Sequence, residues 1–455
     1  MKSWIPIFRR LFPASLYRLE ASVIEKYSKD AWFASASPEV VCFPKNVRQV
    51  SALLKFAHQY RIPVTARGAG KGYVGGCVPV KGGIVLSLEK MNRILEINPE
   101  DGVAVVEPGV ITGRLQEAVK KKGLFYPPDP ASLKDCFIGG NVATNAGGPR
   151  CLKYGVTRNY VLGLEVVLAD GTIVNVGGRT MKNKTGFDLV GIFVGSEGLL
   201  GVVTQVTVRL IPHPQSRGAI CAFFGTATQA AQGVQMILKA GFLPATLEVA
   251  DRLTLEAARK ALGRDRIPPA NAYLLVETDG TESAVRSDLK SIQKILYDLK
   301  PERIEKAYGN QATERLWELR RQFSASLKAT GMKKLNEDIV IPRSRLVELF
   351  KFSEKIQKKF GIPVASFGHA GDGNIHVNLM VDPTDPKQRK NADEALDFLF
   401  KQVIAWKGAI TGEHGVGLAK MPWWKIAASS ELRALHRTVK KALDPKGILN
   451  PGKFV

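Results

Sequence analysis

Cysteine is scarce in this chain, and its few copies are irregularly spaced. The sequence has five cysteines, and no two of them form a C-x-x-C pair: Cys42, Cys77, Cys136, Cys151 and Cys221. An odd number in a chain of 455 residues argues against a disulfide framework, and the spacing argues against an intrinsic iron–sulfur cluster. We therefore expect reduced thiols and a cytoplasmic protein.

Long apolar runs are absent as well. No stretch of the sequence is long and apolar enough to cross a membrane. The opening segment MKSWIPIFRRLF is interrupted by Arg9 and Arg10, and it is too short for a secretory signal. Two interpretations of this segment remain open: a terminal helix packed on the protein, or a short anchor lying in a membrane interface.

Acidic residues are too few to balance the basic ones. Lys and Arg together number 65 and Asp and Glu number 42, which gives a formal net charge of +23. The basic doublets are scattered along the chain, and no motif that reads nucleic acid accompanies them. We expect the charge to serve an anionic substrate or cofactor, an acidic partner subunit, or peripheral contact with the inner face of a membrane.

The chain is long enough for two or three domains, and its hydrophobic periodicity changes near Pro212-His-Pro214. Before this point the pattern predicts an α+β domain with helices at 47–60 and 110–122, hairpins at 92–106 and 161–176, and a strand at 202–210. After it, the pattern predicts strands at 223–225, 273–278 and 364–369, with helices at 226–240, 281–299, 343–360, 386–407 and 430–443. We expect an N-terminal segment (1–35), a first domain (36–213) and a second domain (214–455).

Three glycine-rich segments lie in the first domain, at 67–72, 138–148 and 193–203. Gly70 to Gly75 spell G-x-G-x-x-G, but the pattern that follows is a strand and not the helix that a dinucleotide fold requires. Lys71 is followed by glycine instead of Ser or Thr, which excludes the P-loop of nucleotide triphosphatases. Such loops expose successive backbone N–H groups that bind phosphate oxygens. Three of them in one domain favour a long cofactor lying against the backbone.

The motifs RGAGKG (67–72), PPDP (127–130), GGNVATNAGG (139–148) and GSEGLLG (195–201) occur in an order that resembles a known family. They resemble the PCMH-type FAD-binding domain of the vanillyl-alcohol oxidase superfamily. From about residue 30 to the C-terminus, the chain resembles the branch of FAD-linked D-lactate dehydrogenases and glycolate oxidase catalytic subunits. The resemblance implies a two-part PCMH-type FAD-binding domain plus an α+β substrate (cap) domain, which has an antiparallel sheet and flanking helices.

The resemblance also implies which residues bind FAD. The family's closing motif is similar to residues 443–454, which implies that the tail 440–455 returns to the flavin. No His lies in the 67–76 loop, so we expect non-covalent FAD. Lys71 stands where the family usually has Thr or Ser, and Phe137 stands where it usually has Thr. The implied cofactor residues are Arg67, Gly68, Ala69, Gly70, Lys71, Gly72, Pro128, Ser132, Gly140, Asn141, Thr144, Gly147, Gly148, Glu197, Gly198, Val202 and Asn450.

Three of the six histidines lie in two compact motifs, 368–378 and 411–417. If residues 371–374 form a four-residue hairpin loop, His369 opposes His376 and both imidazoles lie on one face of the sheet. Two imidazoles plus the carboxylate of Glu413 make a three-ligand set with an open position, which suits a catalytic divalent metal. The alternative is a hydrogen-bonded pair of structural histidines beside a glycine turn. In the related D-2-hydroxyacid dehydrogenases, the matching residues bind zinc; Zn and Mn are the expected metals.

The resemblance implies oxidation of a small D-2-hydroxy acid, such as D-lactate or glycolate, to the 2-oxo acid by hydride transfer to flavin N5. A metal would lower the pKa of the substrate hydroxyl, and His414 would take its proton as the family's base does. The segment Leu316–Arg320 resembles the one that supplies the family's carboxylate-binding arginine, so we choose Arg320 over Arg321. Ser324, one helical turn on, and Asn378 are further candidates.

The electrons need a separate acceptor, because the chain lacks cysteines for a cluster of its own. An iron–sulfur subunit, a quinone or an electron-transfer flavoprotein would fit. Two alternatives remain open: a non-redox flavoenzyme similar to alkyl-dihydroxyacetone-phosphate synthase, and a non-enzymatic module that binds anions or metal. Flavin absorbance that bleaches on adding substrate would exclude the second alternative.

Overall fold

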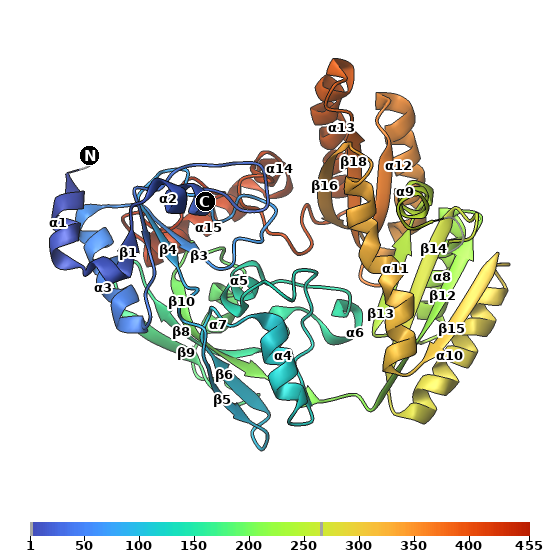
Figure 1. The fold of residues 1–455 in the computed structure, drawn as a ribbon, viewed down its shortest axis with the longest axis horizontal. Coiled ribbons are helices and arrows are strands. Elements are labelled where there is room, and N and C mark those ends of the chain that lie inside the picture. Colours follow the sequence, from blue (N-terminus) through green and yellow to red (C-terminus); the bar gives the residue numbers. More distant parts are fainter. Residues whose placement is uncertain (1–2, 264–266) are drawn as a thin grey trace. The chain divides into compact units, whose positions relative to one another are not determined.

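The computed structural model describes residues 3–263 and 267–455, and the chain divides into two compact units (Figure 1). Unit 1 contains the residues up to Gly147, then Val156–His213 and Glu413–Val455. Unit 2 contains Gly148–Gly155 and Pro214–Gly412. Within the described ranges, no helix combines the length and hydropathy that crossing a bilayer requires.

Unit 1 is built on two main sheets and one short strand pair. In the first sheet, the order is β1-β2-β4-β3, with β2, β4 and β3 parallel. The second sheet, of order β5-β6-β10-β8-β9, is antiparallel throughout, and β11 pairs with β7. The strands of unit 1 are β1 (Tyr17–Arg18), β2 (Val40–Cys42), β3 (Val64–Arg67), β4 (Ile84–Ser87), β5 (Ile94–Asn98), β6 (Val103–Val106), β7 (Leu124–Phe125), β8 (Val161–Val167), β9 (Ile173–Gly177), β10 (Val202–Arg209) and β11 (Ile211–Pro212).

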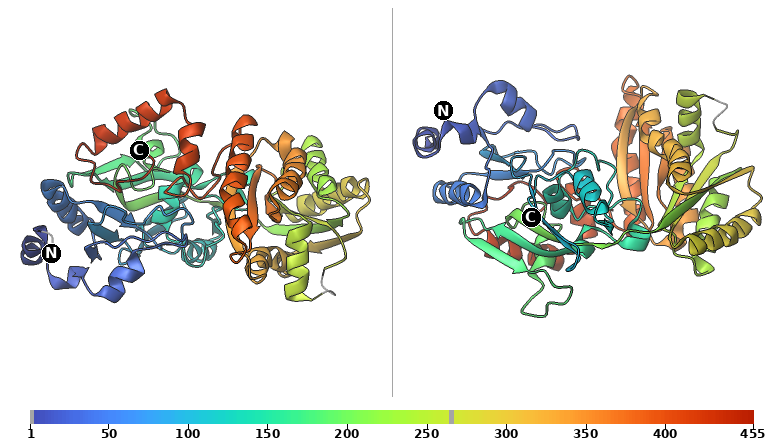
Figure 2. Two further views of the ribbon diagram at one scale, coloured as in Figure 1. Left: turned by 90° about the horizontal axis from the view of Figure 1, so that it is seen from above. Right: turned by 60° about the horizontal axis from the view of Figure 1, so that its bottom comes forward.

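The helices of unit 1 are mostly short and lie around these sheets. They are α1 (Trp4–Leu11), α2 (Ala21–Tyr27), α3 (Val47–Tyr60), α4 (Thr112–Lys120), α5 (Ile138–Thr144), α7 (Leu189–Phe193), α14 (Met421–Ala427) and α15 (Ser430–Leu443). Helix α3 has the bounds that the sequence predicts, because Asn46 caps its first turn through Gln49 N–H and Arg61 ends it in the left-handed conformation. Figure 2 shows α14 and α15 beside the other elements of unit 1, so the chain returns to this unit from Glu413 onward.

The N-terminal segment is a helix packed on the protein, which is the first of its two interpretations. Trp4, Ile5 and Phe8 of α1 are buried in the core that also contains β2, β4 and α3. The Phe8 ring lies 5.5 Å from the ring of Phe56 on α3 and 5.2 Å from that of Tyr17. Edge-to-face aromatic contacts of this kind add to the free energy gained by burying the rings.

Replacing Phe8 by Ala should therefore lower the free energy of unfolding by about 3 kcal/mol, since the substitution leaves a cavity among four aromatic rings. Leu11 on the same helix is 58% exposed, so Leu11→Ala is the matched control. Urea unfolding of the wild type and both variants measures the difference. Equal stability of the two variants would mean that α1 contributes little to the folding of unit 1.

Unit 2 contains one seven-stranded antiparallel sheet of order β15-β12-β14-β13-β17-β18-β16. This sheet and its helices confirm the α+β class and the antiparallel second domain that the sequence predicts. The strands of unit 2 are β12 (Ser216–Phe224), β13 (Thr246–Ala250), β14 (Ala272–Gly280), β15 (Arg303–Tyr308), β16 (Lys333–Val340), β17 (Val364–His369) and β18 (Asn374–Val381).

Helices cover both faces of this sheet (Figure 1). On one face lie α8 (Ala227–Lys239), α10 (Glu282–Tyr297), α12 (Leu346–Phe360) and α13 (Pro386–Ala405), and on the other lie α9 (Arg252–Leu262) and α11 (Asn310–Lys328). The short α6 (Cys151–Tyr154) contacts β13. Under α9 and α11, the core consists of apolar side chains such as Phe223, Tyr273 and Phe367. Polar side chains replace this apolar core on the same face of β13, β16, β17 and β18.

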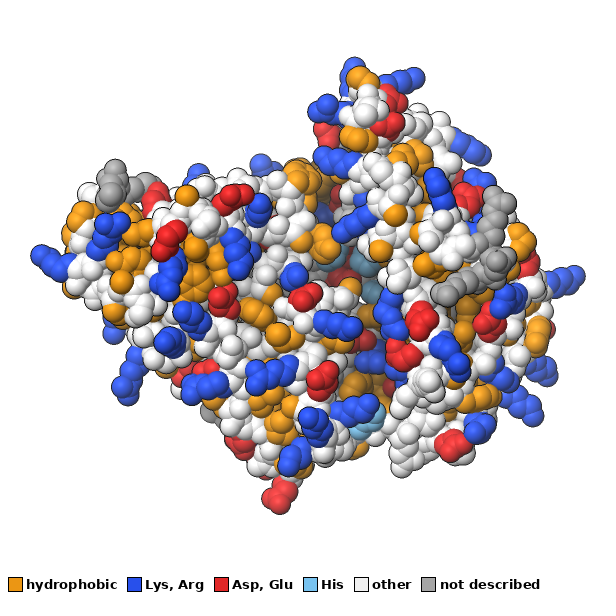
Figure 3. Space-filling view, in the orientation of Figure 1, with side chains coloured by type: hydrophobic (Ala, Val, Ile, Leu, Met, Phe, Trp, Pro, Cys, Tyr) orange, Lys and Arg blue, Asp and Glu red, His pale blue; other side chains and the backbone are white. Residues whose placement is uncertain are grey.

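On the face drawn in Figure 3, the basic side chains do not form a single stripe. Figure 3 shows Lys and Arg side chains spread over the visible face, with Asp and Glu among them. This distribution agrees with the scattered basic doublets of the sequence.

Candidate active site

Unit 1 contains a cavity of about 470 Å³ that is lined by all three glycine-rich segments. Thirteen of the seventeen predicted cofactor residues line it: Arg67, Gly68, Ala69, Gly70, Lys71, Gly72, Ser132, Gly140, Asn141, Thr144, Glu197, Gly198 and Val202. The wall also contains side chains that the sequence did not single out, among them Tyr73, Val74, Pro108 and Phe193. Tyr73, Val74 and Phe193 belong to or adjoin the glycine segments in sequence, whereas Pro108 reaches them only in the folded chain.

The first glycine segment presents free backbone donors to the cavity. Among the described residues, no acceptor is found for the backbone N–H groups of residues 68–72. Arg67 lies behind this loop: its Nη1 donates to Lys29 O (2.7 Å) and Cys77 Sγ (3.3 Å). Gly70 suits this position because its φ is +67°, which side chains rarely adopt, and a Cβ would also meet the Arg67 guanidinium at 2.0 Å. The loop therefore has the unpaired backbone donors that an anion site requires, and the Arg67 guanidinium packs against it at Gly70.

The second glycine segment is the short helix α5, which lies against the cavity. A Cβ on Gly139 would meet Pro108 at 2.6 Å, whereas a Cβ on Gly140 would meet nothing within 4 Å. Gly139 thus allows close packing, and Gly140 leaves room on the cavity side. The side-chain amide of Asn141 is bound to a residue that does not line the cavity, since Nδ2 donates to Thr112 Oγ1 at 2.6 Å.

Four predicted cofactor residues do not line the cavity: Pro128, Gly147, Gly148 and Asn450. The carbonyl of Pro128 accepts a hydrogen bond from Gln116 Nε2, and Gly148 N–H donates to Cys151 Sγ. Asn450 donates from Nδ2 to the carbonyls of Gly76 (2.9 Å) and Glu197 (2.8 Å), so it joins two segments of the cavity wall.

The cavity fits FAD by the chemistry of its donors and by its shape. Five successive N–H groups suit a pyrophosphate, and the open side of Gly140 leaves space for a ligand against the backbone. Cys77 lines the cavity, but burial raises the pKa of its thiol to about 11, which keeps it protonated. A non-covalent cofactor remains our prediction.

Glu413 and His414 line the same cavity of unit 1. The imidazole of His414 lies 5.5 Å from the Tyr73 ring, with 34° between the two planes. The next residues are bound to the carboxylate of Glu197 through Val416 N–H and Gly417 N–H. The predicted base is therefore at the cavity wall, on a loop with defined backbone contacts.

In unit 2, the hairpin β17–β18 differs from the register that the sequence predicts. His369 pairs with Asn374 and His376 pairs with Phe367, so the expected pairing of His369 with His376 is wrong. The loop is residues 370–373 because Gly373 adopts a positive φ of 86° and Asp372 accepts from Asn374 N–H. The shift is by two residues, and side chains alternate with a period of two, so both imidazoles still lie on one face. Their ring centroids are 5.7 Å apart.

His369 belongs to a buried chain of charged side chains. Its Nδ1 lies 2.5 Å from Glu248 Oε1, and Arg320 Nε donates to Glu248 Oε2 at 2.5 Å. Burial raises the pKa of Glu248, but the charges of Arg320 and His369 outweigh burial and the pKa is lowered. Glu248 is thus an ionised carboxylate that binds both neighbours. Strand β13 had no sequence prediction, and Glu248 was missed with it.

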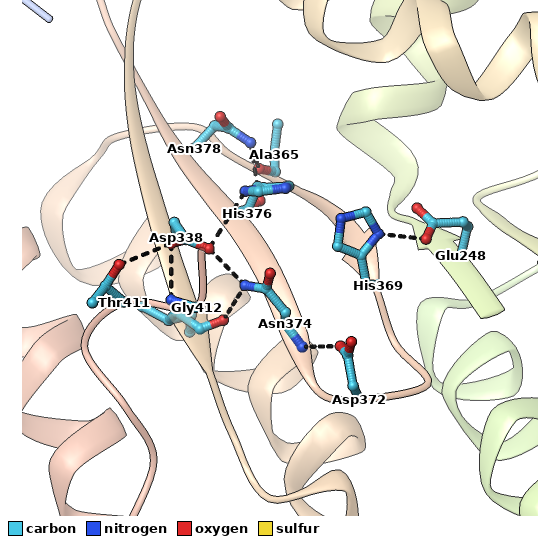
Figure 4. A network of polar contacts seen from close by, with 11 residues as sticks. Glu248, Asp338, Ala365, His369, Asp372, Asn374, His376, Asn378, Thr411 and Gly412 are labelled. Carbon is cyan, nitrogen blue, oxygen red and sulfur yellow. Dashed lines mark hydrogen bonds and ion pairs between the residues drawn. The ribbon is translucent and has the colours of Figure 1, made fainter. Parts of the chain in front are cut away.

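His376 has a carboxylate beside it as well (Figure 4). Its Nδ1 lies 4.0 Å from Asp338 Oδ1, and the other oxygen of Asp338 accepts from Thr411 Oγ1 (3.0 Å) and Gly412 N–H (2.8 Å). Gly412 is the last residue of unit 2, and Glu413 follows it directly. Ring nitrogens of His369 and His376 lie within 4.8 Å of each other. A carboxylate bound to an imidazole, as Glu248 is to His369, is typical of metal-binding histidines, and Asp338 places a second negative charge near His376, so the pair fits a metal.

Two more polar groups lie on the same face of the sheet. Lys334 on β16 donates from Nζ to Ser324 Oγ on α11 (2.8 Å), and burial lowers the pKa of its ammonium to about 8. Asn378 is fully buried and donates from Nδ2 to the carbonyls of Ala365 and His376. Its Oδ1 and that of its strand partner Asn336 have no hydrogen-bond donor among the described residues. Lys334 was missed because a Lys333-Lys334 doublet in a sequence usually marks a solvated surface.

Comparisons with known proteins agree with this geometry. The family of FAD-linked oxidases matches residues 213–454 through its C-terminal domain, and an FAD binding domain matches residues 38–177. The glycolate oxidase subunit GlcD of Bacillus subtilis (strain 168) is 40% identical over 94% of this chain and 91% of its own length. A D-lactate dehydrogenase of Archaeoglobus fulgidus is 37% identical over 91% of this chain and 91% of its own length.

Among solved structures, p-cresol methylhydroxylase with substrate bound superposes with a TM-score of 0.79, covering 98% of this chain and 95% of its own. At 20% identity, that likeness concerns the fold alone. The glycine-lined cavity and the two domain matches agree with the sequence relatives. The chain therefore belongs to the FAD-linked oxidoreductases that include glycolate oxidase GlcD subunits and D-lactate dehydrogenases, and it has their PCMH-type fold.

Proposed function

We propose that this protein oxidises a small D-2-hydroxy acid, with D-lactate and glycolate as the leading candidates. The observation that carries the proposal is the buried chain Arg320–Glu248–His369. In a 2-hydroxy acid, the carboxylate and the hydroxyl are on adjacent carbons, so their binding groups must be close together. The single carboxylate of Glu248 keeps a guanidinium and an imidazole at such a spacing. The names of two relatives, glycolate oxidase subunit and D-lactate dehydrogenase, support the same substrate class.

Arg320 is the proposed partner of the substrate carboxylate. Nε is bound to Glu248, and no acceptor among the described residues is found for the two terminal nitrogens, which can offer the paired donors that a carboxylate prefers. Ser324, one turn along α11, and Lys334 supply a hydroxyl and an ammonium on the same face of the sheet. A small anionic substrate suits this group of donors.

His369, His376 and Glu413 are the proposed ligands of a divalent metal, Zn or Mn. Their donor set is the two imidazoles and the carboxylate that follows Gly412 in the chain. A metal bound there would polarise the substrate hydroxyl and lower its pKa. Glu248 orients the imidazole of His369, and Asp338 lies 4.0 Å from Nδ1 of His376; nearby carboxylates of this kind favour metal binding.

His414 is the proposed base for the hydroxyl proton, since it lines the cofactor cavity and directly follows Glu413. When FAD is bound, it supplies the hydride acceptor for C2 of the substrate. Asn378 offers the buried Oδ1 as a hydrogen-bond acceptor on the substrate face. The reaction then needs an external acceptor of two electrons, and a relative named as a subunit supports a partner protein in this role.

An alkyl-dihydroxyacetone-phosphate synthase-like reaction without net redox is the alternative. It requires a tunnel for a long alkyl chain. The two imidazoles with neighbouring carboxylates favour hydroxyl activation instead, because a metal held by the proposed ligands would lie where the substrate oxygen would bind.

Anaerobic bleaching of the flavin absorbance tests the proposal. The purified protein should be yellow, and one acid from a panel of D- and L-2-hydroxy acids should bleach it. EDTA treatment should abolish bleaching, and added Zn²⁺ or Mn²⁺ should restore it. Bleaching that survives full metal removal would contradict the proposed metal site, and the proposed oxidation of a hydroxy acid would still stand. A flavin that no hydroxy acid bleaches would contradict the proposed function.

A further inference from the structure

Glu197 lies where three parts of unit 1 meet. Its backbone N–H donates to Ala143 O of the glycine helix α5 at 2.8 Å, and its carbonyl accepts from Asn450 of the C-terminal tail. It has a left-handed backbone conformation with φ of 50°, which a residue with a side chain rarely adopts. Glu197 keeps this strained backbone while its N–H and its carbonyl are both hydrogen-bonded, which indicates that the direction of its side chain has a structural or functional role.

The carboxylate of Glu197 accepts two backbone hydrogen bonds from the loop that follows His414. Val416 N–H donates to Oε1 at 2.7 Å, and Gly417 N–H donates to Oε2 at 2.8 Å. Burial raises the pKa of this carboxyl, while the two N–H donors and the charge of Lys453 act in the opposite direction. Two successive N–H groups form a small anion site, and the anion here is a side chain of the protein itself.

Gly415 and Gly417 of the 413–417 loop allow its close contacts with Glu197 and Val74. A Cβ on Gly415 would lie 2.8 Å from Glu197 Oε1, and Gly415 has a φ of 84°. A Cβ on Gly417 would lie 2.4 Å from Val74 O. The loop can therefore approach Glu197 and Val74 only with glycine at both positions. Leu418 N–H and Ala419 N–H then donate to the same Val74 carbonyl.

We propose that Glu197 is a positioning residue, which fixes the backbone of the 413–417 loop and thereby places Glu413 and His414 at the cofactor cavity. This inference rests on the proposed function for the roles of Glu413 and His414. It adds that the third glycine segment does more than line the cavity. The glutamate of Gly195-Ser-Glu-Gly198 connects the cofactor wall to the loop that carries the proposed base and metal ligand.

The substitution Glu197→Gln tests this inference, because Gln keeps the size of the side chain but has only one oxygen. Its NH₂ group would face one of the two N–H donors, so one hydrogen bond is replaced by a donor–donor contact. Asp444→Asn is the matched control. Asp444 is also buried, accepts Ile448 N–H (3.0 Å) and Leu449 N–H (2.8 Å), and has Lys440 beside it, but it does not contact the 413–417 loop.

We expect kcat of Glu197→Gln to fall by about 100-fold, as small displacements of reacting groups do, with KM changed by less than about threefold. Amide hydrogen exchange of Val416 and Gly417 should become at least about tenfold faster. Asp444→Asn should lower the melting temperature while kcat of the folded, flavin-bound protein stays within about twofold of wild type. Flavin absorbance gives the loaded fraction for each variant.

Unchanged exchange at Val416 and Gly417 in Glu197→Gln would overturn the inference, and so would a kcat within twofold of wild type. Activity restored in full by excess FAD would also overturn it, because the role would then be cofactor binding. If Glu197→Gln does not fold, hydrogen exchange on Glu197→Asp replaces it, since the shorter carboxylate cannot reach both donors. A wild type that oxidises no hydroxy acid would contradict the proposed function, and the exchange experiment would still decide the role of Glu197.

Discussion

His414→Ala should lower kcat for the preferred D-2-hydroxy acid by about 1,000-fold, which is the contribution expected of a well-placed general base. The imidazole lines the cofactor cavity of unit 1 beside Tyr73. The loop that carries it is bound through the backbone of Val416 and Gly417, so removing the imidazole leaves that attachment intact. Stopped-flow reduction of the flavin measures the effect on the reductive step alone.

Added imidazole should restore part of the lost activity, because the substitution leaves a space of the right size and chemistry at the cavity wall. His58→Ala is the control: His58 lies on α3, does not line the cavity, and should retain wild-type kcat. Flavin content should be equal in all three proteins. A His414→Ala variant that reduces its flavin at the wild-type rate would remove His414 from the mechanism.

The sequence was sufficient for the cofactor half of this site because its signals are local. Each glycine segment is continuous in sequence, and glycine is favoured where the backbone has a positive φ or approaches another group closely, as at Gly70 and Gly139. Thirteen of seventeen predicted cofactor residues line one cavity for this reason. Asn450 was harder to place, since its contacts with Gly76 and Glu197 cross hundreds of residues. Hydrogen bonds between residues so far apart produce no recognisable pattern in the amino-acid sequence.

The substrate half was only partly predictable. The His369–His376 pair was recognised, but its register was shifted by two residues because the positive φ of Gly373 cannot be derived from composition. The face of the sheet was still correct, since a two-residue shift preserves alternation. In a hairpin with a glycine-rich turn, the sequence therefore predicts the face on which a side chain lies more reliably than it predicts the pairing of the two strands.

Glu248 and Lys334 had no signal of their own in the sequence. Glu248 lies in the middle of the five-residue strand β13, in a run of buried residues that has no strong strand pattern. Its importance comes from Arg320 on α11 and His369 on β17, which are 72 and 121 residues away in sequence. Folding brings these three side chains together, and a family motif marks only two of them.

Arg320→Lys should raise KM for the hydroxy acid by about 100-fold while kcat falls less. Lysine keeps a positive charge opposite Glu248, so the buried carboxylate stays paired and the protein should still fold. Its ammonium is a single point charge, and it lacks the paired terminal donors of the guanidinium for the substrate carboxylate. Losing one charge-assisted hydrogen bond of this kind costs about 1.5–3 kcal/mol, which corresponds to about a 10- to 150-fold loss in binding.

Arg321→Lys is the control that separates two adjacent arginines of one helix. The Arg321 side chain is 50% exposed and pairs with Glu314, whereas the Arg320 side chain is 11% exposed and pairs with the fully buried Glu248. Steady-state kinetics of both variants against the same acid should show a raised KM for Arg320→Lys alone. Both changes keep the positive charge and remove only the guanidinium, so a raised KM in both would mean that the contact with Glu248 does not single out Arg320 as the carboxylate-binding residue. A raised KM in Arg321→Lys only would mean that Arg321, and not Arg320, binds the substrate carboxylate. The proposed position of the substrate would then be wrong.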